Sequence, residues 1–204
     1  GWAENGIHAC INAGIKKLLH LSSVVTIGCS FFAHIHNAQS EYKIKNLDLG
    51  YFETKLEAEK KVMAASKLKS LFTICVNPST IYGFADAKKG SRKNQIKVAQ
   101  GKLPFYTAGG VNVISVDDVT DGIIMALEKG ANGERYILAN ENISIKELFQ
   151  MIAHSAGKPA PQIYLPTFLL HIAGWMGDRL KKGLSRENAY TASMYHWFDS
   201  SKAK

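Results

Sequence analysis

Two patterns of hydrophobic residues alternate along the chain. Leu18 to Leu21 and Leu71 to Val76 are short, almost continuous apolar runs, which are typical of strands buried on both faces of a parallel sheet. From Tyr51 to about Leu68, apolar residues recur every three or four positions without an internal Pro or Gly, and this spacing predicts a helix. Strands that alternate with helices favour an α/β fold.

Local signals predict further elements on both sides of these three. A helix from Glu4 to Ala13 should end at Gly14, and the strand from Asn112 to Val116 should lead into a helix capped by Asp117 or Asp118. The other expectations are a helix between Ser91 and Gln100, a strand at Arg135–Leu138, a capping box at Ser144 and Glu147, a helix beginning at Pro166, an irregular segment from Cys29 to Leu49, and a helix start within 199–204.

The start of the helix at Tyr51 carries candidate chemistry. Tyr51 and Lys55 are four residues apart, so they share one helix face about a turn apart. A nearby cation favours a phenolate and lowers the pKa of a phenol from about 10, which suits reversible proton transfer at a carbonyl or alcohol. Of the eight tyrosines, only Tyr51 has a Lys at this spacing. An ordinary helix start is the alternative interpretation.

The segments around this helix make the pattern specific. The first apolar strand ends in Ser22-Ser23 and reaches Gly28, and the second ends in Asn77-Pro78-Ser79. This order of strand, serines, Tyr-x-x-x-Lys helix, strand and Asn-Pro turn resembles the extended branch of the short-chain dehydrogenase/reductases. Within that branch the chain looks like the NAD-dependent epimerase/dehydratase family, and more narrowly its dihydroflavonol-4-reductase-like members. The resemblance includes 112–119 and 133–138 and runs through nearly the whole chain.

The resemblance implies a role for each matched residue. Tyr51 would be the general acid/base, and Lys55 would lower its pKa and hydrogen-bond the nicotinamide ribose of NAD or NADP. Ser23 would hold the substrate oxygen; it lies five residues before Gly28, and Ser22 is the alternative match. Pro78 and Ser79 would border the nicotinamide ring, chiefly through backbone. The implied substrate is a small molecule, either a sugar nucleotide or a small ketone or alcohol such as a dihydroflavonol.

The implied fold is the C-terminal part of a Rossmann-type doubly wound parallel sheet with a small α-rich substrate-binding subdomain. Residues 1–83 would form a partial Rossmann-like domain with the Ser, Tyr and Lys, and residues 84–204 a substrate-binding part interleaved with the last Rossmann elements.

A nucleotide-binding half would precede this chain in the family. No Gly-x-x-Gly-x-x-Gly turn for a pyrophosphate occurs in the sequence, and the family carries that turn in βα units that would add about 90 residues. We therefore expect a fragment truncated at both ends, inactive alone, with a cofactor affinity no tighter than about millimolar. A non-catalytic remnant or binding protein that retains the fold is the alternative.

Composition narrows the class of protein further. A chain of 204 residues with 46% hydrophobic content can bury a core, and its net charge of +8 comes mostly from scattered Lys residues, so we expect a solvated surface and no nucleic-acid partner. The three cysteines are unpatterned, which predicts a reducing compartment and no metal site. The longest apolar stretch, 168–176, is too short for a membrane span. We expect a cytoplasmic protein without membrane contact, with a homodimer left open.

One basic segment leaves two interpretations open. Six cations lie between Phe84 and Leu103: Lys88, Lys89, Arg92, Lys93, Lys97 and Lys102. They would suit a phosphate-bearing or acidic substrate if they face its pocket. A solvated helix face is at least as good an explanation from the sequence.

Overall fold

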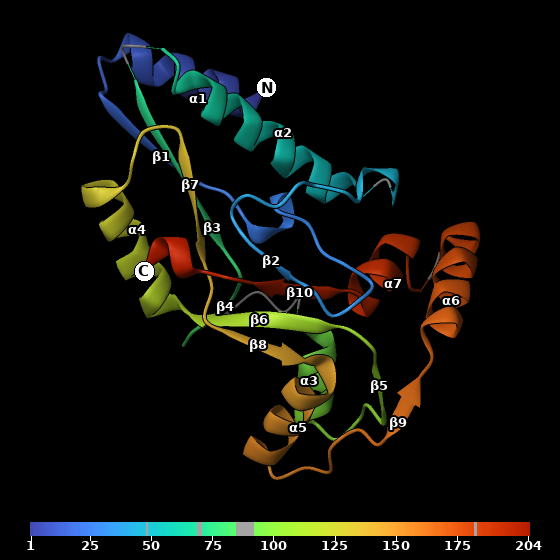
Figure 1. Ribbon diagram of the computed structural model, residues 1–204. Coiled ribbons are helices and arrows are strands. Elements are labelled where there is room, and N and C mark those ends of the chain that lie inside the picture. The colour runs from blue at the N-terminus through green and yellow to red at the C-terminus, as the bar shows by residue number, and fades with distance from the viewer. Residues whose placement is uncertain (48, 69–70, 85–91, 182) are drawn as a thin grey trace.

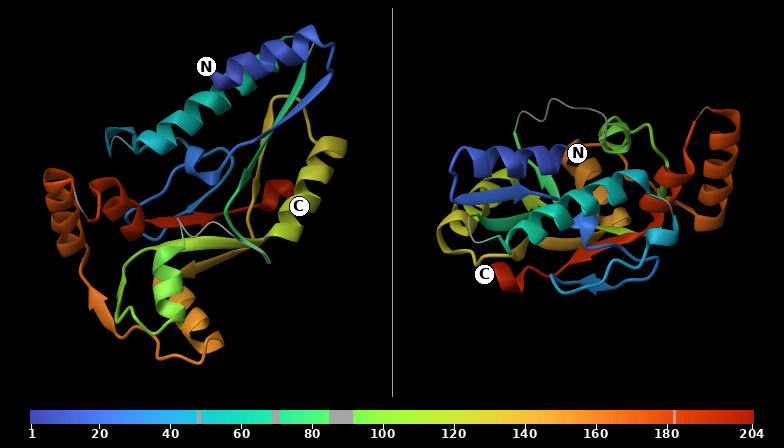
Figure 2. Two further views of the ribbon diagram at one scale, coloured as in Figure 1. Left: turned by 180° about the vertical axis from the view of Figure 1, so that it is seen from behind. Right: turned by 90° about the horizontal axis from the view of Figure 1, so that it is seen from above.

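A three-stranded parallel sheet forms one layer of the molecule. The computed structural model describes residues 1–47, 49–68, 71–84, 92–181 and 183–204. In the sheet, β3 (Phe72–Pro78) lies between β1 (Lys17–Leu21) and β7 (Glu134–Leu138). Helices cover both faces, with α1 (Trp2–Asn12) and α2 (Gly50–Ala65) side by side on one and α4 (Val116–Lys129) on the other (Figures 1 and 2). This two-sided covering is the arrangement that the apolar runs predicted.

The side chains of β3 show why its sequence is apolar at almost every position. Ile74 and Val76 pack with α4, whereas Cys75, between them, packs with Val62 of α2. Successive side chains of a strand point to opposite faces, so a strand covered on both sides needs apolar residues at odd and even positions. Asn77 continues the Cys75 side and therefore reaches α2 at the carboxyl end of the strand.

The rest of the chain builds a second, mixed sheet with four helices around it. Its strand order is β2 (Ile35–His36), β10 (Tyr195–Phe198), β6 (Gly110–Ser115) and β4 (Thr80–Tyr82), with β8 (Glu141–Ser144) antiparallel to β6. The pair β5 (Phe105–Thr107) and β9 (Ile163–Leu165) is separate. Helices α3 (Lys93–Ala99) and α5 (Ile145–Ser155) pack together, as do α6 (Thr167–Leu180) and α7 (Arg186–Ser193) (Figure 1).

Short 3₁₀ turns complete the chain at Val24–Thr26 (η1), Lys45–Leu47 (η2) and Ser201–Ala203 (η3). The C-terminus lies beside α4 (Figure 2). Within the described residues, no helix combines the length and apolar character that crossing a bilayer requires. Cys10, Cys29 and Cys75 are free thiols.

The α/β fold with a parallel sheet is confirmed, and several local expectations need correction. Asp117 and Asp118 do not cap α4, because the Ser115 hydroxyl accepts from the backbone N–H of Asp118 at 3.0 Å. The segment predicted to be irregular contains β2 and η2, and residues 201–203 form a 3₁₀ turn. The helix that begins at Gly50 ends at Ala65, and the predicted cap Ser91 lies outside the described residues. The capping box of Ser144 and Glu147 is present.

Candidate active site

The candidate site lies at the carboxyl ends of β1 and β3. Ser22 and Ser23 follow β1, and Asn77, Pro78 and Ser79 finish β3 and leave it. The backbone N–H of Ser22 donates to the carbonyl of Val76 at 2.9 Å, and that of Ser79 donates to the carbonyl of Leu138 at 2.9 Å. The first bond joins the end of β1 to β3, and the second joins the end of β3 to β7, at the edge where open α/β sheets bind ligands.

The two adjacent serines have different environments. The Ser22 hydroxyl is buried and donates to Oε2 of Glu59 at 2.5 Å. Ser23 is the N-cap of η1 and lines a cavity. Among the described residues, its Oγ accepts a single long bond of 3.4 Å, from the N–H of Val25. The hydroxyl of Ser22 is thus committed to the interior, and the role of Ser23 at the substrate stays a prediction.

The cavity at Ser23 has the size of a small-molecule site. Its volume is about 700 Å³, within the range of known ligand pockets. Polar residues from six elements or their ends are among those that line it: Ser23, Ser79, Lys93, Asn112, Asn188 and His196. The Ser79 hydroxyl is buried and lacks a hydrogen-bond partner among the described residues. A buried hydroxyl without a partner is costly, so this group is suited to bind a ligand.

The basic segment divides between the cavity and the surface. Lys93 lines the cavity, whereas the guanidinium of Arg92 stacks over the Tyr82 ring at 4.0 Å and donates to the carbonyl of Ile81. Lys93, Lys97 and Lys102 are all exposed, and Lys88 and Lys89 lie outside the described residues. Among the described cations of this segment, Lys93 is the one that faces the cavity.

Tyr51 and Lys55 occupy the first turns of α2. Tyr51 is 55% exposed, its ring is in edge contact with that of Phe52, and Lys55 is half-buried. Neither is among the described residues that line the cavity of Ser23 and Ser79. The structure thus brings Ser23 and Ser79 together at one cavity, and the roles of Tyr51 and Lys55 stay predictions.

The pKa of His20, in β1, depends on the charges of two residues of α2. His20 of β1 is half-buried, and its Nε2 has no partner in the described part of the chain. Burial lowers the pKa of His20, the charge of Glu59 opposes this effect, and the charge of Lys55 adds to it.

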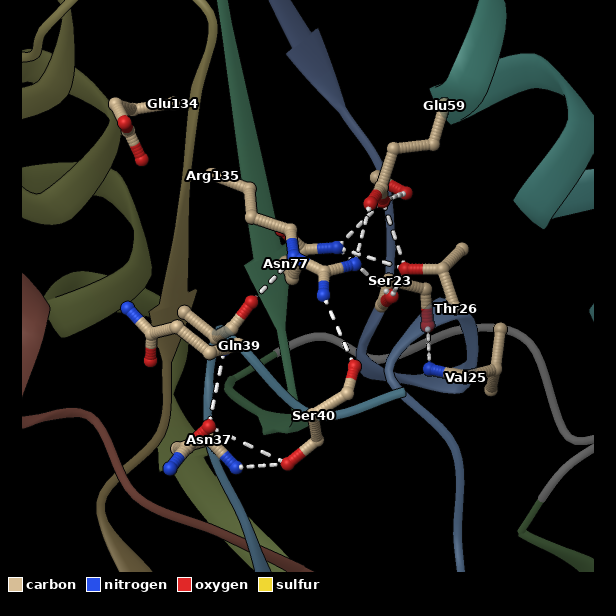
Figure 3. A network of polar contacts seen from close by, with 12 residues as sticks. Ser23, Val25, Thr26, Asn37, Gln39, Ser40, Glu59, Asn77, Glu134 and Arg135 are labelled. Atoms are coloured by element: carbon tan, nitrogen blue, oxygen red, sulfur yellow. Dashed lines mark hydrogen bonds and ion pairs between the residues drawn. The ribbon is translucent and has the colours of Figure 1, made fainter. Parts of the chain in front are cut away.

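Sequence reasoning missed a buried acid on the same helix. Glu59 is 2% exposed, and its Oε2 accepts hydrogen bonds from Thr26 Oγ1 at 2.7 Å and Asn77 Nδ2 at 2.6 Å (Figure 3). Tyr51, Lys55 and Glu59 recur every four residues, so each lies about one turn beyond the last, with a small rotation. That spacing was the available signal, but an isolated Glu on a helix normally indicates a solvated face.

Other features do not add to this site. No group of three or more His, Cys, Asp or Glu side chains within the described ranges could hold a metal ion. A hollow of about 580 Å³ between Tyr82, Ile114 and α5 is lined mainly by apolar residues and does not include Ser23 or Ser79. A reacting substrate needs polar groups that orient it, so we place the site at the serines.

Comparisons with known proteins agree with this arrangement. Residues 3–152 match the 3-beta hydroxysteroid dehydrogenase/isomerase family. A putative dihydroflavonol 4-reductase from Synechocystis sp. is 28% identical over 209 residues, which cover 97% of this chain and 61% of the relative. The crystal structure of gox2253 superposes with a TM-score of 0.83 at 30% identity and covers 99% of this chain and 63% of its own.

A more distant structure shows the fold alone. The dTDP-glucose 4,6-dehydratase of Bacillus anthracis, solved in complex with NAD, has a TM-score of 0.73 at 17% identity, over 99% of this chain and 58% of its own. This chain spans about three fifths of the length of these proteins. The family predicted from Ser23, Tyr51, Lys55 and the Asn-Pro turn is confirmed: the chain belongs to the 3-beta hydroxysteroid dehydrogenase/isomerase family, with dihydroflavonol-4-reductase-like relatives and the fold of the NAD-dependent epimerases and dehydratases.

Proposed function

We propose that the protein containing this chain is an NAD(P)-dependent oxidoreductase or epimerase acting on a sugar nucleotide or a small ketone or alcohol. The observation that carries the proposal is the cavity of about 700 Å³ that is lined by both Ser23 and Ser79 at the carboxyl ends of β1 and β3; the Ser79 hydroxyl has no hydrogen-bond partner in the described part of the chain. Membership of a dehydrogenase family and the NAD bound by the related dehydratase fold support it.

The described residues fit the nicotinamide end of such a cofactor. When bound, the nicotinamide supplies or accepts a hydride. Pro78 and Ser79 would border its ring, because Pro78 ends β3 and Ser79, the next residue, lines the cavity. Lys55 would hydrogen-bond the ribose, and the pyrophosphate would need a Gly-rich turn that this sequence does not contain. NAD and NADP both remain candidates.

The chain's own side chains would handle the substrate oxygen and its proton. Ser23 would hold the oxygen by a hydrogen bond from the hydroxyl that lines the cavity. Tyr51 would donate or accept the proton as general acid/base, and the ammonium of Lys55 would stabilise the phenolate form. Lys93 is an exposed residue that lines the cavity, and its positive charge there would favour substrates that carry phosphate or carboxylate.

The wider properties expected from the sequence are also proposals. They are a division near residue 83 between a Rossmann-like part and a substrate-binding part, a cytoplasmic location and a homodimer. Chromatography with light scattering on the complete protein tests the dimer directly.

A turnover screen of the complete protein tests the proposed activity. Sugar nucleotides and small alcohols or ketones would be offered with NAD or NADP, while the absorbance of the reduced nicotinamide is followed. A dehydrogenase changes that absorbance, whereas an epimerase regenerates its cofactor and is detected from its epimeric product. Cofactor binding without a product from any substrate class would favour the non-catalytic alternative.

A further inference from the structure

Three donors from the edge of the candidate site converge on one oxygen of Glu59. Oε2 accepts from Ser22 Oγ at 2.5 Å, Thr26 Oγ1 at 2.7 Å and Asn77 Nδ2 at 2.6 Å. Ser22 precedes Ser23, and Asn77 precedes Pro78 and Ser79, so both are one or two residues from the cavity. The Asn77 amide nitrogen also lies 3.1 Å from the carbonyl oxygen of Ser23.

The second oxygen of Glu59 is paired with a guanidinium from the opposite edge of the sheet. Arg135 of β7 donates from Nη1 to Oε1 at 3.2 Å. Its Nε and Nη2 donate to the carbonyls of Ala38 and Ser40 at 2.7 and 3.2 Å (Figure 3). All three guanidinium nitrogens are therefore used, in the planar fork that Lys cannot reproduce.

These contacts connect the segments that carry or adjoin Ser23, Ser79, Tyr51 and Lys55. The loop held by Arg135 lies in the chain between Ser23 and Tyr51. Glu59 itself lies two turns beyond Tyr51 on α2, so the helix that carries Tyr51 and Lys55 is fixed where Glu59 is fixed. A carboxylate that is 2% exposed must keep its partners, since an unpaired buried charge is strongly unfavourable.

We propose that Glu59, held by Arg135, is the positioning residue that sets the Tyr51–Lys55 helix against Ser23 and Ser79. This inference rests on the proposed function for its catalytic consequence. Tyr51 and Lys55 share one rigid helix, so a change at Glu59 moves them together and leaves their mutual distance unaltered. Their distance to Ser23 changes, because Ser23 is carried by the end of β1.

The test compares Glu59→Gln with Glu57→Gln in the complete protein. Glu57 is exposed on the same helix, so it controls for the loss of one carboxylate from α2. The Gln side chain has only one acceptor oxygen, and its NH2 group would face a donor of either Arg135 or Asn77, so one of the present hydrogen bonds is lost. We expect kcat of Glu59→Gln to fall about 10–100-fold, as for a displacement near 1 Å, with KM within about threefold. Rates are divided by the fraction of sites that bind nicotinamide, so unfolded protein does not contribute.

Two readouts separate positioning from a merely structural role. The acidic limb of the pH–rate profile should stay in place in Glu59→Gln, because the Tyr51–Lys55 pair moves as a unit. Hydrogen exchange, which needs no activity, should quicken at the amides of Thr26, Ile27 and Ser40 and stay unchanged in α5. Arg135→Lys, which keeps a cation but loses the fork, should show the same pattern more weakly and serves if Glu59→Gln does not fold.

Each outcome decides one part of the inference. Unchanged hydrogen exchange in both Glu59→Gln and Arg135→Lys would contradict the proposal that Glu59 holds these segments in place. Faster hydrogen exchange with an unchanged kcat per cofactor-binding site would show that Glu59 and Arg135 stabilise the structure without positioning Tyr51 and Lys55 for catalysis. A wild-type protein without nicotinamide-dependent chemistry would contradict the proposed function, and exchange alone would then decide whether Glu59 and Arg135 hold these segments together.

Discussion

At the scale of single residues, two neighbouring serines have different surroundings in the fold and are expected to have different roles. The side chains of Ser22 and Ser23 point to different surroundings, the first to Glu59 in the interior and the second to the cavity. Their sequence contexts are nearly identical, and the choice of Ser23 rested on its distance to Gly28. The burial of Ser22 gives that choice a physical reason, which substitution can test.

Ser22→Ala and Ser23→Ala should have opposite signatures. Removing the Ser22 hydroxyl takes one hydrogen bond from a buried carboxylate, so we expect about 1–3 kcal/mol less free energy of unfolding. Ser23→Ala should change stability little and lower turnover much more, because the described residues give the Ser23 hydroxyl only one hydrogen bond, and that bond is 3.4 Å long. Urea unfolding and steady-state kinetics on both variants measure this. Equal effects on stability and turnover in the two would remove the distinction between the serines.

Lys93 offers a second test at the same scale. If the substrate carries phosphate or carboxylate, Lys93→Gln should raise KM and leave kcat nearly unchanged, since a charge that binds substrate and transition state equally affects binding alone. Lys97→Gln is the control, because Lys97 lies on the same helix and is equally exposed but does not line this cavity. Equal KM values in the two variants would indicate that the basic segment is a solvated helix face and does not bind substrate.

Glu59 and Arg135 mark the limit of residue-level prediction. Tyr51, Lys55 and Ser23 could be found because their types and spacing are specific. Glu59 could not, because its role depends on partners from β1, η1, β3 and β7 that only the folded chain assembles. Burial of a charge is a property of tertiary structure, whereas helix periodicity is a property of sequence.

At the scale of elements, long periodic segments were predicted well and their boundaries less well. β1, β3, α2 and α5 follow from apolar patterns and caps that act locally. The start of α4 was placed too late, because β6 leads into the helix without an intervening loop and several good capping residues follow one another. β2 was missed, since a two-residue strand exists only through its pairing with β10, more than 150 residues away.

The corrected cap of α4 predicts a specific stability change. Ser115→Ala should lower the free energy of unfolding by about 0.5–2 kcal/mol, because it removes the acceptor for the N–H of Asp118. Asp117→Asn should lower it less, since it alters only a charge near the helix N-terminus, worth about 0.3–1 kcal/mol. Thermal and urea unfolding give both values. A larger loss in Asp117→Asn would restore the cap originally expected.

At the scale of the whole molecule, buried histidines couple stability to pH. Burial lowers the pKa of His20, His36, His171 and His196. As pH falls below about 6.5, the unfolded chain therefore takes up protons before the folded one, and folding stability declines toward the lowered folded values. The sign is the same for all four groups, so their contributions to acid destabilisation add.

His20 gives this pH dependence a direct test. His20→Leu should flatten the slope of unfolding free energy against pH below about 6.5, because it removes one group that the unfolded state protonates first. His8→Gln, an exposed position on α1, is the matched control. Urea midpoints measured at several pH values give the slopes. A slope in His20→Leu as steep as that of the wild type would show that this histidine does not contribute.

The central claim for the whole molecule is that Tyr51 transfers the proton in a nicotinamide-dependent reaction at the Ser23 cavity. The most direct measurement is turnover of the complete Tyr51→Phe protein, with cofactor affinity determined by calorimetry and Tyr164→Phe, an exposed tyrosine on β9, as control. Turnover should fall by about two to four orders of magnitude, the effect of losing a positioned acid/base group, with nearly unchanged cofactor affinity because the ring remains. Near-normal turnover in Tyr51→Phe would contradict the account.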